Sequence, residues 1–600
     1  MLRARTPTAS PRTSPPPPLS PTRLRASRSS SAASTMIPSH RGPHGAFEVV
    51  DPASHADHKN CNVTDLTVST PGNTRRATDE PPPPRWRTPE FYAYYVLFVL
   101  VVPLLVYWPM RLSTSSNQNY WTYAHKLSPG WMYGRQVDAS DGQYRNFRNN
   151  LGSLALLSIA FLVPSHLVRR AGWSDADKRA RFIAAFALVM LTVLHGVGVF
   201  KVLAILVGNY YAAKATKPPG IERFWPAIVI VANMAILFAN WKFDGYKFGA
   251  LHSALGDLDA LTGILPRWHI GFNITMLRIV SFAVDYHWRA APPSSPPTDH
   301  RGRTGSSLQE SDYNLVNFIA YALYPPLYIA GPILTFQDFM WQLHRPLDIT
   351  TRERISYAVR FVFCLLTMES ILHTMYVTAI KDTRAWQGAS PADLSMIGFW
   401  NLVIVWLKLL IPWRFFRLWS LFDGIDPPEN MIRCVANNFS TLGFWRSWHR
   451  SYNLWVVRYI YIPLGGAKNM ILATLTVFTF VALWHDLSFK LLAWGWLVSL
   501  FILPELIGRF LVPASKYGGE WWYRHVAAAG GVVNILLMMS ANLVGFVLGV
   551  EDMLHLVYEL ISTWNGWAFF IFASSCLFVG VQVMFEYREE EARRGIDRRC

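Results

Sequence analysis

Residues Phe444–Gly466 read FWRSWHRSYNLWVVRYIYIPLGG, and an apolar run from Met470 to Trp484 follows before a second histidine, His485. A polar side chain at bilayer depth costs free energy, roughly 2.5–3.5 kcal/mol for a charged one on insertion scales. Such residues therefore usually line a cavity, a pathway or a reaction centre. The two histidines, His449 and His485, indicate chemistry inside a membrane.

The composition is that of a membrane protein. Hydrophobic residues make up 51% of the chain and charged residues 16%, whereas soluble domains carry about 25% charged residues. Apolar stretches of about 17–25 residues, the length of a spanning helix, recur along the chain. They are Phe91–Met110, Leu151–Val168, Phe182–Tyr211, Pro226–Trp241, Leu315–Phe336, Ile355–Ile380, Met396–Leu410, Met470–Trp484, Leu491–Val512, Val526–Val550 and Trp567–Phe585.

We therefore predict an all-α polytopic membrane protein with about 10–12 transmembrane helices. The sequence His195-Gly196-Val197-Gly198 can split the third stretch into two helices. Gly271–Trp288 is expected to be interfacial.

Four regions follow from the distribution of polar residues. Residues 1–88 are rich in Pro, Ser and Arg and are predicted to form a disordered tail. Residues 89–588 form the transmembrane domain, and within it residues 290–312 are expected to be a disordered loop. Residues 589–600 form a charged C-terminal tail. No internal repeat is found, which disfavours the many transporters that are built from two related halves.

The net charge of +17 favours contact with anionic membrane lipids, and no segment resembles a nucleic-acid-binding module, so no nucleic-acid partner is expected. The five cysteines form no CxxC pair, which argues against a disulfide framework or a Cys-rich metal site.

The stretch around His449 combines aromatic and polar residues. If Phe444–Ile460 is helical, five aromatic side chains form one stripe along it, and His449 and Asn453 form an i, i+4 pair beside that stripe. Pro463 to Gly466 ends the helix, and the next helix returns His485 to membrane depth. One cavity can then hold both histidines. No third ligand stands at a suitable spacing, so no metal site is predicted.

A neutral imidazole can accept the proton of a hydroxyl while the oxygen attacks a thioester carbonyl. The chain has no GxSxG nucleophile elbow, which favours direct acyl transfer over a covalent acyl-enzyme.

The segment FWRSWHRSYNLWVVRYIYIPLGG followed by ALWHD resembles the membrane-bound O-acyltransferase superfamily. This resemblance implies a fold with a central intramembrane cavity, with His485 as the catalytic histidine and His449 as the second catalytic position. Acyl-CoA is the implied co-substrate, and no cofactor is required.

Within the superfamily the chain looks most like the fungal glycerol uptake protein subfamily, sister to hedgehog acyltransferase. The residues that carry this likeness are RWRTPEFYAYY before the first span, Asp312–Gln342 and DPPENMIRC before His449. The resemblance implies acylation of a lyso-GPI anchor in the endoplasmic reticulum membrane, with the plasma membrane as a second location, and a link to glycerol uptake.

Side chains near the expected donor entrance are candidates for substrate binding. They are Arg446, Arg450, Asn453, Arg458 and Lys468. The arginines and the lysine can pair with coenzyme A phosphates or extend to lipid headgroups.

Cys434 stands where hedgehog acyltransferase has a haem-ligating cysteine in a PPxxPRC stretch. The stretch here reads PPENMIRC and lacks the second proline, and a buried free thiol is the alternative. Two other functions also stay open: a transporter or regulator of transport for glycerol, and an acyltransferase that modifies proteins.

Overall fold

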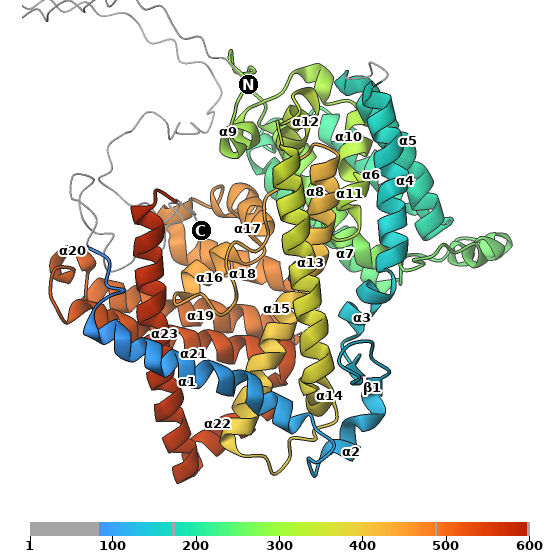
Figure 1. Cartoon of the computed structure of the whole chain (residues 1–600). Coiled ribbons are helices and arrows are strands. Elements are labelled where there is room, and N and C mark those ends of the chain that lie inside the picture. Colours follow the sequence, from blue (N-terminus) through green and yellow to red (C-terminus); the bar gives the residue numbers. More distant parts are fainter. Residues whose placement is uncertain (1–82, 171–174, 486–488, 597–600) are drawn as a thin grey trace, which may run out of the picture. The chain divides into compact units, whose positions relative to one another are not determined.

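The computed structural model describes residues 83–170, 175–485 and 489–596. Across these residues the chain is almost entirely helical, with one two-stranded antiparallel ladder (Figure 1). Eight helices within the described part are long and apolar enough to cross a membrane. The prediction of an all-α polytopic membrane protein is confirmed.

The eight long helices are α1 (Pro89–Leu112), α4 (Leu151–Arg170), α7 (Trp225–Lys242), α13 (Thr351–Thr374), α15 (Pro391–Phe422), α19 (Phe489–Leu511), α21 (Tyr523–Asn542) and α23 (Trp564–Arg593). The other α-helices are α2 (Tyr120–Tyr123), α3 (Gly142–Asn149), α5 (Ala176–His195), α6 (Gly198–Lys214), α8 (Trp268–His287), α9 (His300–Gly305), α10 (Leu315–Ala322), α11 (Pro325–Tyr328), α12 (Phe336–His344), α14 (Val377–Asp382), α16 (Thr441–Ser447), α17 (Arg450–Val456), α18 (Met470–His485), α20 (Ala514–Tyr517) and α22 (Gly549–Ser562). The strands are β1 (Leu127–Ser128) and β2 (Val137–Asp138).

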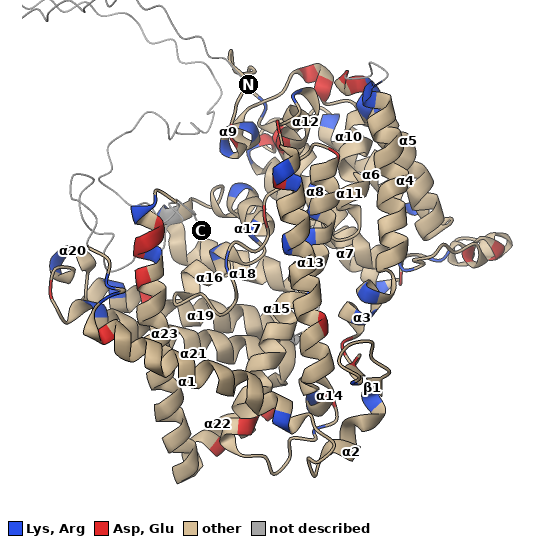
Figure 2. Ribbon diagram, viewed as in Figure 1, with Lys and Arg blue, Asp and Glu red and all other residues tan. Residues whose placement is uncertain are grey.

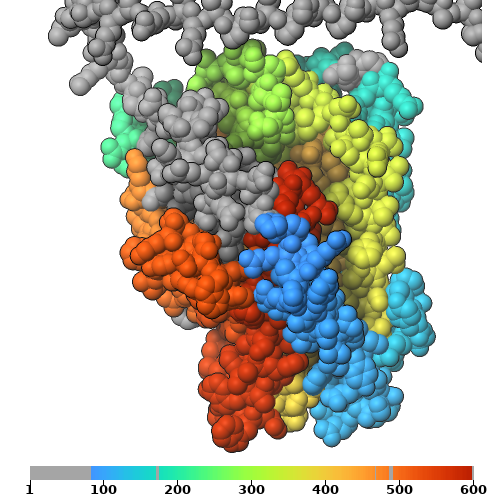
Figure 3. Space-filling view, turned by 60° about the vertical axis from the view of Figure 1, so that its left-hand side comes forward, coloured from blue at the N-terminus to red at the C-terminus, as the bar shows by residue number. Residues whose placement is uncertain are grey.

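The long helices leave apolar surface uncovered. In α1 only 6% of the apolar window is buried, and the helix lies at the molecular surface beside α23 (Figure 3). Charged residues gather mainly toward helix ends and connecting segments, while long stretches of the helices carry none (Figure 2). This division is expected when a protein presents apolar side chains to lipid and charged ones to the interfaces.

Helix α8 lies in the core, and the prediction of an interfacial segment at Gly271–Trp288 is wrong. Every residue from Thr275 to Tyr286 is buried. An interfacial helix exposes one polar face, whereas a helix that is covered on all sides belongs to the interior.

Two apolar stretches are interrupted. The stretch Phe182–Tyr211 divides into α5 and α6 at Gly196, whose φ of 56° suits a residue without a Cβ. The apolar stretch Leu315–Phe336 consists of α10, α11 and a non-helical stretch that leads to α12. The prolines of this segment, Pro325, Pro326 and Pro332, explain why one helix cannot continue through it.

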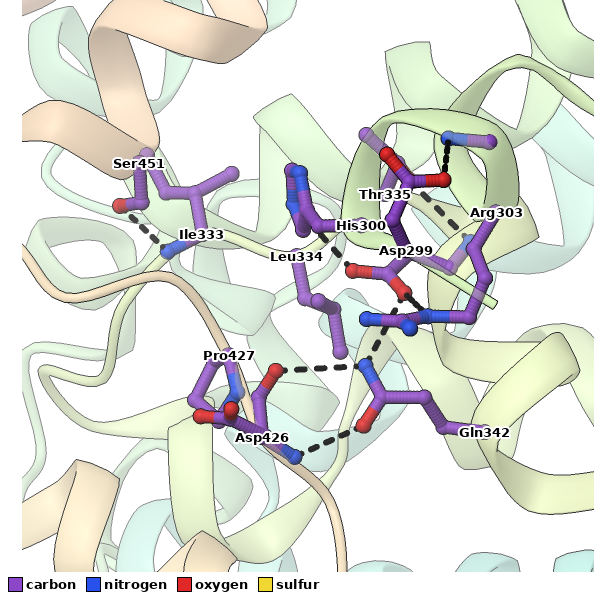
Figure 4. A network of polar contacts seen from close by, with 12 residues as sticks. Asp299, His300, Arg303, Ile333, Leu334, Thr335, Gln342, Asp426, Pro427 and Ser451 are labelled. Carbon is purple, nitrogen blue, oxygen red and sulfur yellow. Dashed lines mark hydrogen bonds and ion pairs between the residues drawn. The ribbon is translucent and has the colours of Figure 1, made fainter. Parts of the chain in front are cut away.

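The segment 290–312 contains ordered structure, contrary to the prediction of a disordered loop. It forms α9, whose Arg303 is buried and donates through Nε to the carboxylate of Asp338 at 2.6 Å. His300 Nε2 lies 3.3 Å from the same carboxylate, and Gln342 donates to it at 3.0 Å (Figure 4). The buried carboxylate of Asp338 explains why α9 is ordered, because α9 supplies the partners without which burying that charge would be costly.

The tails are described only in part. Residues 1–82 and 597–600, which hold most of the predicted disordered tail and the end of the charged tail, lie outside the described residues. The charged stretch that begins at residue 589 is helical up to Arg593, because α23 continues into it. There Glu589 accepts from Arg524 at 2.9 Å and Glu591 from Arg433 at 3.0 Å.

We expect Asp338→Asn to destabilise the protein by about 3–5 kcal/mol, because it leaves the buried Arg303 without its counter-charge. Chemical unfolding of the purified protein in detergent measures this loss. The matched control is Asp348→Asn, which changes an exposed carboxylate just beyond α12. Replacing both partners, Arg303→Met with Asp338→Leu, should recover part of the stability. Equal stability of Asp338→Asn and the control would contradict this account.

Candidate active site

His449 lies at a sharp break between two short helices. Helix α16 ends at Ser447, Trp448 is extended, and α17 begins at Arg450. His449 itself has a φ of 47° and a ψ of 49°, the left-handed conformation that non-glycine residues rarely adopt. The predicted continuous helix from Phe444 to Ile460 is therefore wrong. Strained backbone of this kind is found preferentially at functional sites.

The DPPENMIRC segment holds this break in place. The carbonyl of Asn430 accepts from the backbone N–H of Arg450 at 3.1 Å, and its side-chain oxygen accepts from the N–H of Ser451 at 3.1 Å. Met431 forms a β-bridge with Trp448. The hydroxyl of Ser451 accepts from the N–H of Ile333 at 2.8 Å (Figure 4). The first N–H groups of α17, which no helical carbonyl can satisfy, thus find partners outside the helix.

Aromatic rings bring the two predicted histidines into one cluster. His449 is stacked between Trp413 and Tyr452, with centroid distances of 4.5 and 5.2 Å and interplanar angles of 22°. Tyr452 is stacked on Trp484 at 4.5 Å, and its centroid lies 6.5 Å from that of His485. Tyr452 therefore contacts both imidazoles, although they stand 36 positions apart in the sequence. We call these five residues the histidine cluster.

His449 and His485 differ from the buried structural histidines in the hydrogen bonding of their ring nitrogens. His195 Nδ1 contacts the carbonyl of Leu265 at 2.7 Å and Nε2 contacts the hydroxyl of Tyr328 at 3.0 Å. Both ring nitrogens of His373 are likewise engaged. Within the described part of the chain no hydrogen bond occupies the ring nitrogens of His449 or His485. Stacking holds the faces of His449 and leaves the ring edge for a substrate.

Helix α8 braces the histidine cluster from the core. The side-chain amide of Asn273 donates to the carbonyl of Trp484 at 2.9 Å, and Trp484 Nε1 donates back to the carbonyl of Asn273 at 3.0 Å. One turn further along α8, the carbonyl of Leu277 accepts from Trp455 Nε1 at 3.0 Å. The residue that precedes His485 is thus fixed through both its backbone and its side chain.

A buried ion pair between Asp285 and Arg458 also fixes the segment after α17 to α8. Asp285 is fully buried and accepts from Arg458 Nη2 at 2.9 Å and from the hydroxyl of Tyr459 at 3.0 Å. Ser281 contacts the hydroxyl of Tyr459 at 2.8 Å. Sequence reasoning missed Asn273, Ser281 and Asp285. They follow one another at intervals of eight and four residues, within about a third of the helix circumference. This spacing along a mostly apolar segment is the signal that could have found them.

The predicted substrate-binding residues are spread over this region. Arg458 pairs with Asp285 and also donates to Gln337 at 3.0 Å. Arg446 and Arg450 are partly exposed, and Lys468 is exposed beyond η6 (Val457–Tyr461), the π-helical turn after α17. Asn453 donates its backbone N–H to the carbonyl of His449 at 3.0 Å, an ordinary helical hydrogen bond, and its side-chain oxygen is buried without a partner among the described residues. Their roles toward a substrate stay predictions.

Cys434 lies in the segment before α16 with an exposed side chain, so the alternative of a buried thiol is wrong. Its carbonyl accepts from Asn437 and Asn438. An exposed sulfur can be reached by a ligand, but among the described residues no His, Asp, Glu or second Cys completes a group of three around it. The haem assignment stays a prediction.

Comparisons with known proteins agree with this geometry. The model of the membrane-bound O-acyltransferase family matches residues 220–550, a range that includes α8 and both histidines of the cluster. The chain belongs to this family. Members of the family are acyltransferases, and we describe the protein as one from here on.

Individual relatives extend the match over nearly the whole chain. The membrane-bound O-acyltransferase GUP1 of Saccharomyces cerevisiae is 46% identical over 88% of this chain and 96% of its own length. GUP2 of the same yeast is 39% identical over 89% of this chain and 92% of its own. The protein-cysteine N-palmitoyltransferase HHAT of Mus musculus is 29% identical over 45% of this chain and 56% of its own.

We expect Asn273→Ala to lower kcat for acyl transfer about 10- to 100-fold, because a small displacement of a catalytic group is costly, and to leave the KM for acyl donor nearly unchanged. Steady-state kinetics of the purified protein measure both constants. The matched control is Asn233→Ala, which removes a buried amide of α7 that contacts Asn209 and Val229 instead. An equal loss of kcat in both variants would mean that Asn273 serves general stability only.

Proposed function

We propose that the protein transfers a long fatty acyl group from acyl-CoA to a hydroxyl of a lipid acceptor, with His485 as general base and His449 as its partner. The observation that supports this most directly is the histidine cluster. Two imidazoles with uncommitted ring nitrogens, the half-buried His449 and the exposed His485, meet around one tyrosine of an apolar helical protein. The yeast relatives are membrane-bound O-acyltransferases by name, which agrees with this reaction type.

The reaction needs one proton acceptor. His485 takes the proton of the acceptor hydroxyl while that oxygen attacks the thioester carbonyl. The carbon–sulfur bond then breaks, the ester remains on the acceptor, and the proton passes from the imidazolium to the departing thiolate of coenzyme A. His449, held by its stacked faces, can donate to or accept from a substrate at its ring edge and so orient the reacting groups.

The acceptor we propose is a lyso-GPI anchor, and the site of action is the endoplasmic reticulum membrane. Both rest on the resemblance to the fungal glycerol uptake subfamily. The multi-pass helical fold is compatible with this location, and the apolar surface of α1 and its neighbours suits an acceptor that arrives through the bilayer. A link to glycerol uptake would then be indirect, through the composition of the membrane.

We expect His485→Ala to reduce acyl transfer from long-chain acyl-CoA to lyso-GPI about 100- to 10,000-fold, the usual contribution of a general base. The assay uses purified protein in detergent, with size-exclusion chromatography as the test of folding. The matched control is His125→Ala, which removes an exposed histidine near β1. Glycerol flux in proteoliposomes is measured in parallel.

Three outcomes separate the alternatives. Loss of transfer in a monodisperse His485→Ala protein supports the proposal. Glycerol flux that survives the substitution, with no transfer by the natural protein, would establish transport instead. Labelling of secreted proteins with an alkynyl fatty acid, without labelling of glycolipid, would show that the acceptor is a protein.

A further inference from the structure

Arg414 is a cation without a counter-charge in the interior of α15. Its Nε is buried and has no hydrogen-bond partner, and its Nη1 donates to the sulfur of Cys364 at 3.0 Å. In the described part of the chain no carboxylate lies within ion-pair distance of this guanidinium. The residue stands about two turns before the end of α15 at Phe422, so it lies within a spanning helix.

Arg417 and Arg278 are compensated, whereas Arg354 of α13, like Arg414, has a buried Nε without a hydrogen-bond partner in the described part of the chain. Arg417, one turn along the same helix, pairs with Asp426 at 2.5 Å and with Glu429 at 3.3 Å. Arg278 donates to two backbone carbonyls, at 2.9 and 2.6 Å. A thiol is a weak acceptor and leaves most of the donors of Arg414 unused. Because an ionisable residue in a spanning helix is costly unless it is paired, an uncompensated one is a candidate functional residue.

The position of Arg414 connects it to the reaction centre. The preceding residue, Trp413, is stacked on His449 at 4.5 Å. Arg414 itself turns toward α13, which packs against α15 and carries Cys364. Its side chain is partly exposed, so a ligand that lies along these helices can reach it. Arg414 is thus the sequence neighbour of a residue of the histidine cluster, while its guanidinium contacts α13.

We propose that Arg414 binds the phosphate of the lipid acceptor and thereby sets its hydroxyl at the histidine cluster. This inference rests on the proposed acyl transfer. A planar guanidinium binds phosphate with two parallel hydrogen bonds. Phosphate occurs in both substrates, but at different distances from the reacting atoms. In a lysophospholipid the free hydroxyl is only a few bonds from the phosphate, whereas in acyl-CoA the whole pantetheine arm lies between thioester and diphosphate.

The test measures binding and turnover separately. A fluorescent lysophospholipid is titrated into protein that carries His485→Ala, with and without Arg414→Gln. We expect Arg414→Gln to weaken binding about 10- to 100-fold, the effect of losing hydrogen bonds to a charged group. Arg414→Lys should recover part of the affinity. The matched control is Arg223→Gln, an exposed arginine that packs on Phe224 before α7.

Kinetics on the active protein then distinguish the two sources of phosphate. With Arg414→Gln we expect the KM for a phosphate-bearing lysolipid to rise about 10- to 100-fold, while the KM for acyl-CoA and the turnover of a neutral monoacylglycerol change little. A rise confined to the KM for acyl-CoA would overturn the acceptor assignment in favour of the donor. Unchanged binding and unchanged KM values would overturn the site itself.

The binding arm also keeps the inference separate from the proposed function. If the natural protein shows no acyl transfer, the proposed function fails whatever Arg414 does. Binding of lysophospholipid that depends on Arg414 would still support the phosphate site, and binding that is independent of Arg414 would refute it. A variant that does not stay monodisperse is replaced by Arg414→Lys, whose affinity for a neutral and a phosphate-bearing lipid is compared directly.

Discussion

The compensation of buried charge is the constraint on which this structure depends. Asp285 has no exposed surface, and it is tolerable there only because Arg458, Tyr459 and Ser281 satisfy its oxygens. These partners come from α8 and from the π-helical turn that follows α17. The requirement to satisfy one carboxylate thus fixes how the segment after His449 packs on the core. Removing one partner of such a pair is strongly destabilising. Other packings of this segment, which would leave Asp285 unpaired, are therefore disfavoured.

The same logic explains how two sequence-distant histidines reach one place. Asn273 and Asp285 both lie on α8, about a third of the helix circumference apart, and the first holds Trp484 while the second holds the turn after α17. A single rigid helix therefore sets the spacing between the segments that carry His449 and His485. Catalytic groups need placement to within a fraction of an ångström, and a helix buried along most of its length supplies that better than a loop.

The sequence predicted the apolar helices well and the polar interruptions poorly. The run Met470–Trp484 became α18 with nearly the predicted ends, because length and hydropathy decide a helix in an apolar solvent. The break at His449 was missed because its left-handed backbone is held by Asn430 and Met431, which lie outside the segment. The core position of α8 was missed for a similar reason, because the helices that cover α8 on all sides lie elsewhere in the sequence.

The left-handed backbone of His449 shows why the arrangement of the histidine cluster could not be predicted from spacing alone. In a continuous helix His449 and Tyr452, three positions apart, would be neighbours on the helix surface. Trp448, four positions before Tyr452, would be a neighbour of Tyr452 as well. The break turns Trp448 to the bridge with Met431 and leaves His449 to stack between Trp413 and Tyr452. The strained backbone thus stacks the face of an imidazole, rather than an indole, on Tyr452, which also lies beside the helix end that carries His485.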